Sequence, residues 1–106
     1  MVPALQPILG EFRRGLQELY GPRLVHVVLF GSQARGDAEP DSDIDLLIVL
    51  AGPVQAGAEI ARVGPLQADV SLRHNCVISC VFMDEDRYLH RQGPLLRNIR
   101  REGVIL

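Results

Sequence analysis

The sequence has 106 residues, of which 47% are hydrophobic and 23% charged, and its formal net charge at pH 7 is −2. This length and balance are typical of a soluble globular protein with one modest core, so we expect residues 1–106 to form a single domain. The slightly negative charge argues against a protein that binds nucleic acid by neutralising its phosphates, and we do not expect nucleic acid as a direct ligand.

The first half of the chain is predicted to contain one helix and two strands. No leader pattern stands at the N-terminus and no apolar run reaches membrane-spanning length, which predicts a cytoplasmic protein without membrane contact. Apolar residues at three- and four-residue spacings predict a helix over residues 4–20, ended by a Gly-Pro pair. The apolar run 24–30 predicts a buried strand, the polar residues 31–42 a loop, and residues 43–50 a second strand.

A helix and a third strand are predicted next. Residues 54–73 have the pattern of a helix, which the Gly-Pro pair at 64–65 must interrupt or kink. The apolar run 76–83 predicts the strand and contains Cys76 and Cys80. Their spacing is typical of small, reduced core residues and not of zinc ligands.

The last part of the chain is predicted to form two shorter helices and a tail. Acidic residues at 84–86 favour the start of a helix that reaches His90. Pro94 suits the first position of a last helix that ends at Arg101. The apolar tail 104–106 packs internally, joins a sheet edge or meets a partner. Three strands and several helices in this order predict an α/β fold around a small sheet.

The loop after the first strand has the residue types of a phosphate site. Gly31 follows the strand, and its missing side chain lets the backbone approach a ligand closely. Ser32 is predicted to be the N-cap of a short helical turn. The free N–H groups of such a turn, together with the serine hydroxyl, can hold phosphate oxygens.

A pair of carboxylates follows this loop at the start of the second predicted strand. Asp43 and Asp45 are two positions apart, so their side chains project to the same side of the strand. Two carboxylates on one face repel each other unless a cation lies between them, and Mg²⁺ commonly combines such carboxylates with substrate phosphates. Each fragment alone is typical of an ordinary turn or a solvated strand start. The joint pattern G-S-x10-D-x-D indicates a function.

The stretch from Gly31 to Leu46 resembles the signature of the DNA polymerase β-like nucleotidyltransferase superfamily, and the short chain is most similar to its minimal nucleotidyltransferases. The resemblance implies the nucleotidyltransferase fold, with a small mixed sheet of about three to four strands and flanking helices. It also implies transfer of a nucleoside monophosphate, usually from ATP, to a hydroxyl.

The resemblance further implies a role for each residue of the motif. Gly31 and Ser32 would bind the nucleotide phosphates, and the catalytic carboxylates Asp43 and Asp45 would bind Mg²⁺. Arg35 lies in the same loop and either reaches a phosphate or pairs with Asp37 or Asp41. The sequence leaves these alternatives open, because Arg35, Asp37 and Asp41 share one short loop.

One expected feature of the superfamily is missing. Its mechanism usually includes a third carboxylate on the next strand, and the register places that position at Ser79, with Cys76 as second choice. A serine is a poor general base and a weak Mg²⁺ ligand. The acids around the strand would need a bend to replace it, and they are interpreted as solvated helix-end charges: Asp69, Asp84, Glu85 and Asp86.

Two functional hypotheses therefore stand side by side. In the first, the chain is an adenylyltransferase that acts on a hydroxyl of a partner protein. Minimal nucleotidyltransferases are commonly antitoxins paired with a small helical HEPN toxin, which implies a HEPN partner here. In the second hypothesis, the chain is a catalytically impaired partner-binding subunit that keeps the nucleotide-binding fold. A polymerase that extends nucleic acid is disfavoured, because no basic template channel is visible.

Overall fold

The structure is a computed structural model that describes residues 5–39 and 42–106. Its elements in chain order are α1 (Leu5–Tyr20), the 3₁₀ turn η1 (Gly21–Arg23), β1 (Leu24–Phe30), α2 (Ser32–Arg35), β2 (Ile44–Leu50), α3 (Ala56–Arg73), β3 (Ile78–Asp84), α4 (Glu85–His90), α5 (Pro94–Glu102) and β4 (Val104–Ile105). Within these described ranges, none of the helices is both long and apolar enough to cross a membrane.

The strands form one mixed sheet in the order β3-β2-β1-β4. β1 runs antiparallel to both β2 and β4, whereas β2 and β3 are parallel. The parallel pair is possible because α3 makes the crossover between its two strands. The predicted fold class, a small mixed sheet of three to four strands with flanking helices, is confirmed.

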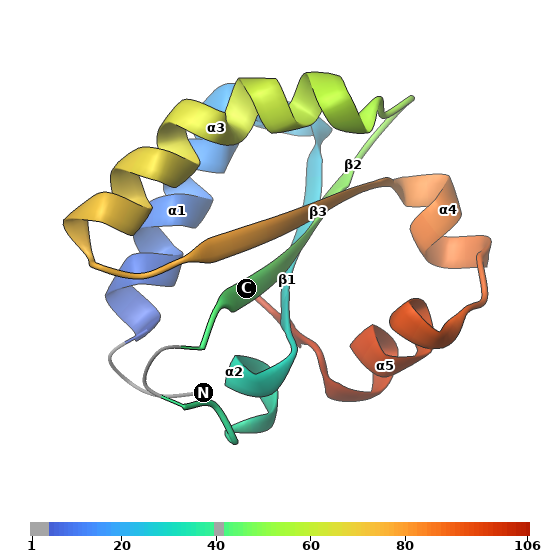
Figure 1. Cartoon of the computed structure of the whole chain (residues 1–106). Helices are drawn as coiled ribbons and strands as arrows, with labels where there is room; N and C mark the ends of the chain where they lie inside the picture. Colours follow the sequence, from blue (N-terminus) through green and yellow to red (C-terminus); the bar gives the residue numbers. More distant parts are fainter. Residues whose placement is uncertain (1–4, 40–41) are drawn as a thin grey trace.

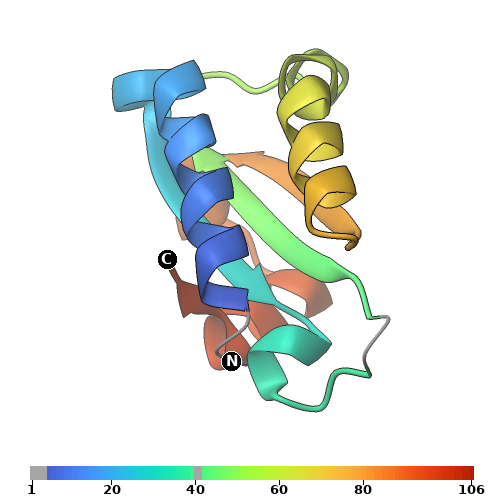
Figure 2. The same ribbon diagram turned by 90° about the vertical axis from the view of Figure 1, so that its left-hand side faces the viewer.

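Helices cover both faces of this sheet (Figures 1 and 2). Alternate residues of β2 pack against α1 and α3 on one face, in a core that includes Leu46, Phe12 and Val63. The intervening residues of β2, such as Leu47, pack against Leu96 and the rest of α5 on the other face. β2 is therefore a central strand with two buried faces, which explains its almost continuous apolar sequence.

Most predicted boundaries are confirmed within one or two residues, and the differences have local causes. α3 runs through Pro65 without a break, and the axis of the helix changes direction along its length (Figure 2). Of the two predicted alternatives, an interruption or a kink, the structure thus shows the kink. β3 begins at Ile78 and not at residue 76, because Asn75 has a positive φ of 50° and still belongs to the turn.

The C-terminal tail joins the sheet edge, one of the three alternatives left open by the sequence. Val104 and Ile105 pair antiparallel with Leu29 and Val28 of β1. The N–H of Leu106 continues the ladder by donating to the carbonyl of Val27 at 2.9 Å. The tail therefore supplies the fourth strand of the sheet.

Candidate functional site

The residues singled out in the sequence meet at one end of the sheet. β1 ends at Phe30, and because β1 is antiparallel to β2, that end lies beside the start of β2. Asp45 pairs with Phe30 on one side and with Ser79 of β3 on the other. The turn at Gly31 therefore follows directly on the strand that neighbours Asp45, as the joint motif requires.

Gly31 brings the backbone against the carboxylate of Asp45. Its φ of 75° and ψ of −157° lie in a region of backbone conformation that is essentially restricted to glycine. A Cβ atom at this position would lie 2.5 Å from Oδ2 of Asp45. Only glycine therefore permits the observed closeness of turn and carboxylate.

The short helix α2 starts immediately after this glycine. The carbonyl of Gly31 accepts hydrogen bonds from the N–H groups of Ala34 and Arg35, both at 3.1 Å. Gly31 is thus the N-cap residue and Ser32 is the first helical residue, so the prediction of Ser32 as N-cap was wrong. The chain can place glycine there because the turn needs a positive φ, which outweighs the preference for a capping hydroxyl.

The loop that leads from α2 to β2 is closed by a buried amide. Gln33 is only 7% exposed, and its Nε2 donates to the carbonyl of Ser42 at 3.3 Å. The hydroxyl of Ser42 accepts a hydrogen bond from the N–H of Glu39 at 2.9 Å. Sequence reasoning missed Gln33, because nothing in the spacing marks a buried amide inside a polar loop. Asp41 lies outside the described residues.

The two carboxylates differ in environment. Asp43 is exposed and precedes the first residue of β2, whereas Asp45 is half-buried within the strand. Burial raises the pKa of Asp45 above its ordinary value, the negative charge of Asp43 raises it further, and Arg35 partly offsets both effects. Ionised Asp45 is therefore held in a position where a nearby cation would stabilise it.

Ser79 occupies the neighbouring position on β3, as predicted from the register. It pairs with Asp45 across the parallel ladder, and its hydroxyl donates to Oδ2 of Asp43 at 3.4 Å. Cys76, the second choice, packs instead against the core that α1 and α3 cover. The site thus presents a serine hydroxyl beside two carboxylates.

The other acids near β3 have structural partners elsewhere. Oδ1 of Asp84 accepts from the N–H of Arg87 at 2.7 Å and caps α4, at the far end of β3. Oδ2 of Asp69 accepts from Arg73 at 2.9 Å on α3. Their interpretation as helix-end charges is confirmed for these two residues. Neither one replaces a third carboxylate at Ser79.

Arg35 is held by two acidic side chains. Its Nε lies 3.2 Å from Oδ2 of Asp37 and its Nη1 lies 3.2 Å from Oε2 of Glu102. The pairing with Asp37 was one of the predicted alternatives. Glu102 was not predicted, because it follows 67 positions later in the chain and reaches Arg35 only through the packing of α5. A phosphate contact by Arg35 stays a prediction.

Comparison with known proteins identifies the family. The nucleotidyltransferase domain family matches residues 9–102. The chain belongs to this family. A nucleotidyltransferase-like protein of Methanocaldococcus jannaschii, provisionally named a protein adenylyltransferase, is 32% identical over 99 residues, which are 92% of this chain and 93% of that protein.

Solved structures show the same nucleotidyltransferase fold at lower identity. A provisionally named nucleotidyltransferase from Sulfolobus solfataricus has a TM-score of 0.67 and 22% identity, over 96% of this chain and 78% of that one. A Shewanella oneidensis complex, described as a tri-AMPylated HEPN toxin with its MNT antitoxin, gives a TM-score of 0.61 and 16% identity, over 94% and 69%. The predicted membership of the nucleotidyltransferase family is confirmed.

The donor set of this nucleotidyltransferase fits a cation that is shared with a nucleotide. Among residues 5–39 and 42–106, no group of three His, Cys, Asp or Glu side chains is placed to hold a metal ion by itself. Asp43 and Asp45 nevertheless form a like-charged pair, and Mg²⁺ is usually held by one or two carboxylates together with substrate phosphates. The residues present suit such a shared site better than a closed all-protein cage.

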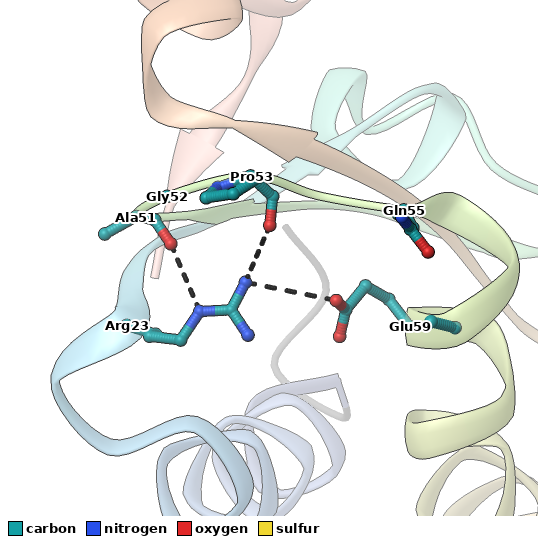
Figure 3. A pocket seen from close by; sticks show the side chains of 7 residues that line it. Arg23, Ala51, Gly52, Pro53, Gln55 and Glu59 are labelled. Carbon is teal, nitrogen blue, oxygen red and sulfur yellow. Dashed lines mark hydrogen bonds and ion pairs between the residues drawn. The ribbon is translucent and has the colours of Figure 1, made fainter.

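A second polar region lies at the opposite end of β2, around a pocket of about 530 Å³ (Figure 3). Arg23 donates to the carbonyls of Ala51 and Pro53 at 3.1 and 3.2 Å, and its guanidinium lies 3.9 Å from the carboxylate of Glu59. Oε1 of the buried Glu59 also accepts from the hydroxyl of Tyr20 at 2.7 Å. These charges satisfy one another, so we interpret this region as structural.

Proposed function

We propose that this nucleotidyltransferase transfers AMP from ATP, or the corresponding monophosphate from another NTP, to a hydroxyl of a partner protein. The main observation in support is the closeness of Gly31 to Asp45. Because Gly31 has no Cβ, the backbone of the turn can lie directly against the carboxylate of Asp45. The turn that we propose as the phosphate loop therefore lies beside the carboxylate of Asp45. We also propose that residues 1–106 act as one domain in the cytoplasm.

The relatives support a protein acceptor. The Methanocaldococcus protein carries a name for adenylyl transfer to protein, and the Shewanella complex contains an AMPylated HEPN toxin beside an MNT antitoxin. By analogy, this chain would modify a small helical HEPN protein and act as its antitoxin. Shared fold and family membership support this proposal.

The proposed reaction joins the acceptor to the α-phosphorus of ATP. The oxygen of the acceptor hydroxyl bonds to that phosphorus, the bond to the bridging oxygen of the β-phosphate breaks, pyrophosphate leaves, and the hydroxyl proton passes to water. The N–H groups of Ala34 and Arg35 donate to the carbonyl of Gly31, which leaves those of Ser32 and Gln33, at the start of α2, for a ligand. These N–H groups and the Ser32 hydroxyl would bind phosphate oxygens, and they would orient the nucleotide for the reaction.

Asp43 and Asp45 would hold Mg²⁺ together with the nucleotide. When bound, the cation neutralises phosphate charge and the repulsion between the two carboxylates. The hydroxyl of Ser79 would keep Asp43 oriented through the contact already described. Arg35 would bind a phosphate only after leaving Asp37 or Glu102, since both carboxylates now share its guanidinium.

The test is transfer of labelled AMP from ATP in the presence of Mg²⁺, with and without the HEPN-type protein encoded by the neighbouring gene. Asp43→Asn and Asp45→Asn should each lower the transfer rate at least about a hundredfold, because each removes a carboxylate of the metal site. Asp86→Asn, a remote and exposed acid on α4, is the matched control and should leave the rate unchanged. Equal rates in all variants would refute the proposal.

A second function is favoured by Ser79 and would give a different result. Because a serine stands beside Asp45, where the superfamily usually has a third acid, the chain could bind its partner without catalysis. In that case no label is transferred by any form of the protein. A stable complex with the partner would persist in Asp43→Asn and Asp45→Asn.

A further inference from the structure

An exposed apolar side chain lies beside the carboxylates on the side away from the phosphate loop. The strand order β3-β2-β1-β4 places Gly31, at the end of β1, on one side of Asp45 and Ser79 on the other. Val77 precedes β3, and its carbonyl accepts a hydrogen bond from the N–H of Ile44 at 2.8 Å. This bond belongs to the Ile44–Ile78 pair, the first of the ladder, so the backbone of Val77 lies directly beside the start of β2.

Strand alternation places Val77 on the same face as the carboxylates. Val81 and Met83 of β3 pack on the face that α5 covers, together with Leu47 of β2. Residues at odd positions of β3 share that face, and Asp45 shares it through β2. We name the surface formed by Val77, Ser79 and Val81 the β3 lip. Val77 is 56% exposed, whereas Ile78, the next residue along β3, is buried.

The proposed transfer places the leaving group and the attacking hydroxyl on opposite sides of Asp43 and Asp45. In phosphoryl-type transfer, the attacking oxygen and the leaving oxygen are roughly in line through the phosphorus. If the loop at Gly31 and Ser32 holds the leaving pyrophosphate, the attacking hydroxyl approaches from the opposite side. That side is the β3 lip, because β2 lies between β1 and β3.

We propose that the acceptor protein docks on the β3 lip, with an apolar residue beside its reacting hydroxyl resting on Val77. This inference rests on the proposed function and names where its second substrate binds. The lip is uncharged and borders two carboxylates, so it suits an apolar polypeptide flank. A polynucleotide acceptor would bring phosphates toward Asp43 and Asp45 without a cationic side chain on the lip to neutralise them.

The experiment compares Val77→Arg with Ile105→Arg in the full chain. Ile105 is 60% exposed and lies on β4, at the opposite edge of the same sheet, so it matches Val77 in exposure but not in position. Three quantities are measured for each variant: the KM for ATP, the KM for the HEPN-type partner, and the rate of transfer to N-acetyltyrosinamide as a small acceptor. Circular dichroism melts check that both variants fold.

Val77→Arg should raise the KM for the partner about tenfold or more, because a charge then opposes an apolar contact. The KM for ATP and the rate with the small acceptor should stay within about twofold of the parent values. Ile105→Arg should change none of the three. An unchanged partner KM in Val77→Arg, an equal loss in both variants, or transfer of label to an RNA 3′ hydroxyl in place of the protein would overturn the proposal.

A binding measurement keeps this test separate from the proposed function. Partner affinity is titrated calorimetrically with the Asp45→Asn chain, alone and combined with each Arg substitution. If the parent chain transfers no label, the proposed activity fails, yet weaker partner binding caused by Val77→Arg alone still supports docking on the lip. If the partner does not bind, or binds equally to all forms, the docking proposal fails.

Discussion

The two polar regions at the ends of β2 both contain carboxylates, but the charges around these carboxylates differ. In the Glu59 network (Tyr20, Arg23, Glu59 and Arg62), a carboxylate that is 4% exposed meets two guanidiniums and a phenol hydroxyl. Both guanidiniums also lie over the Tyr20 ring, at 5.7 and 5.8 Å from its centroid. At the carboxylate end (Gly31, Asp43, Asp45 and Ser79), two negative charges lie near each other, and the serine hydroxyl donates to only one of them, Asp43.

The unpaired carboxylates, and not the paired ones, are the candidates for chemistry. A buried charge that is fully paired contributes to the folded state and requires no ligand. Two like charges beside a glycine turn destabilise the folded chain unless something positive joins them. A pocket of about 530 Å³ lies at the paired region, so the presence of a cavity does not by itself mark the place of the chemistry.

Among substitutions in the two regions, Gly31→Ala is expected to have the largest effect on stability and transfer rate together. The new Cβ meets Oδ2 of Asp45 and needs a backbone conformation that alanine avoids, so we expect a loss of about 1–3 kcal/mol in the free energy of unfolding. Displacing the carboxylate should also lower the transfer rate about a hundredfold. Urea unfolding and the labelled-ATP assay measure the two effects.

The control for this substitution is Gly10→Ala. Gly10 lies within α1 and has open space around its Cβ position, so alanine should stabilise the protein by about 0.5–1 kcal/mol. If both glycine variants gave the same stability and rate, the special role of the turn at Gly31 would be disproved.

An intermediate effect, restricted to stability, is expected from Glu59→Ala. The substitution leaves the buried Tyr20 hydroxyl without its acceptor, which should lower the free energy of unfolding by about 1–3 kcal/mol. For a chain of this size the melting temperature would fall by roughly 4–8 °C per kcal/mol. The transfer rate per folded molecule should not change. A selective loss of transfer would show that the Glu59 network belongs to the active machinery.

The smallest effect is a gain in stability from Asp45→Asn. Because the pKa of Asp45 is raised in the folded chain, its favourable contribution is complete below the ordinary pKa and is lost as the pH rises through the folded value. Asparagine cannot ionise, so the variant should melt at a higher temperature than the parent at pH 7. The difference between the two should shrink as the pH falls into the acidic range.

Added Mg²⁺ should reverse this order of stability. A ligand that binds only the folded state raises its melting temperature, and the parent chain retains both carboxylates for the cation. Thermal melts at pH 7 with ATP, with and without Mg²⁺, measure this reversal. A variant that melts below the parent at every pH without Mg²⁺ would contradict the repulsion argued for Asp43 and Asp45.

Local patterns predicted β1 and the motif residues, because their information is contained in short stretches. The apolar run 24–30 has the observed bounds of β1, and the alternation around Asp45 predicted two carboxylates on one face. The register even placed Ser79 beside them. These features depend on strand periodicity, which a sequence displays directly.

Contacts between distant segments could not be predicted in the same way. Arg35 meets Glu102 and Tyr20 meets Glu59 only after α5 and α3 have packed on the sheet. Gln33 is buried and donates to the carbonyl of Ser42, nine positions later, although its sequence context is polar throughout. Such pairs depend on tertiary packing, and the spacing of residues along one sequence does not reveal it.

The central position of β2 has a consequence for length variation in such chains. Removing or adding one residue within β2 would turn Asp45 toward the face of α1 and α3, into the core with Leu46 and Phe12. The interval of one residue between the two aspartates is therefore fixed by the pleat of the strand. The interval between Ser32 and Asp43 crosses a connection between elements, and connections tolerate insertions. Within a lineage, the second interval can drift in length while the first cannot.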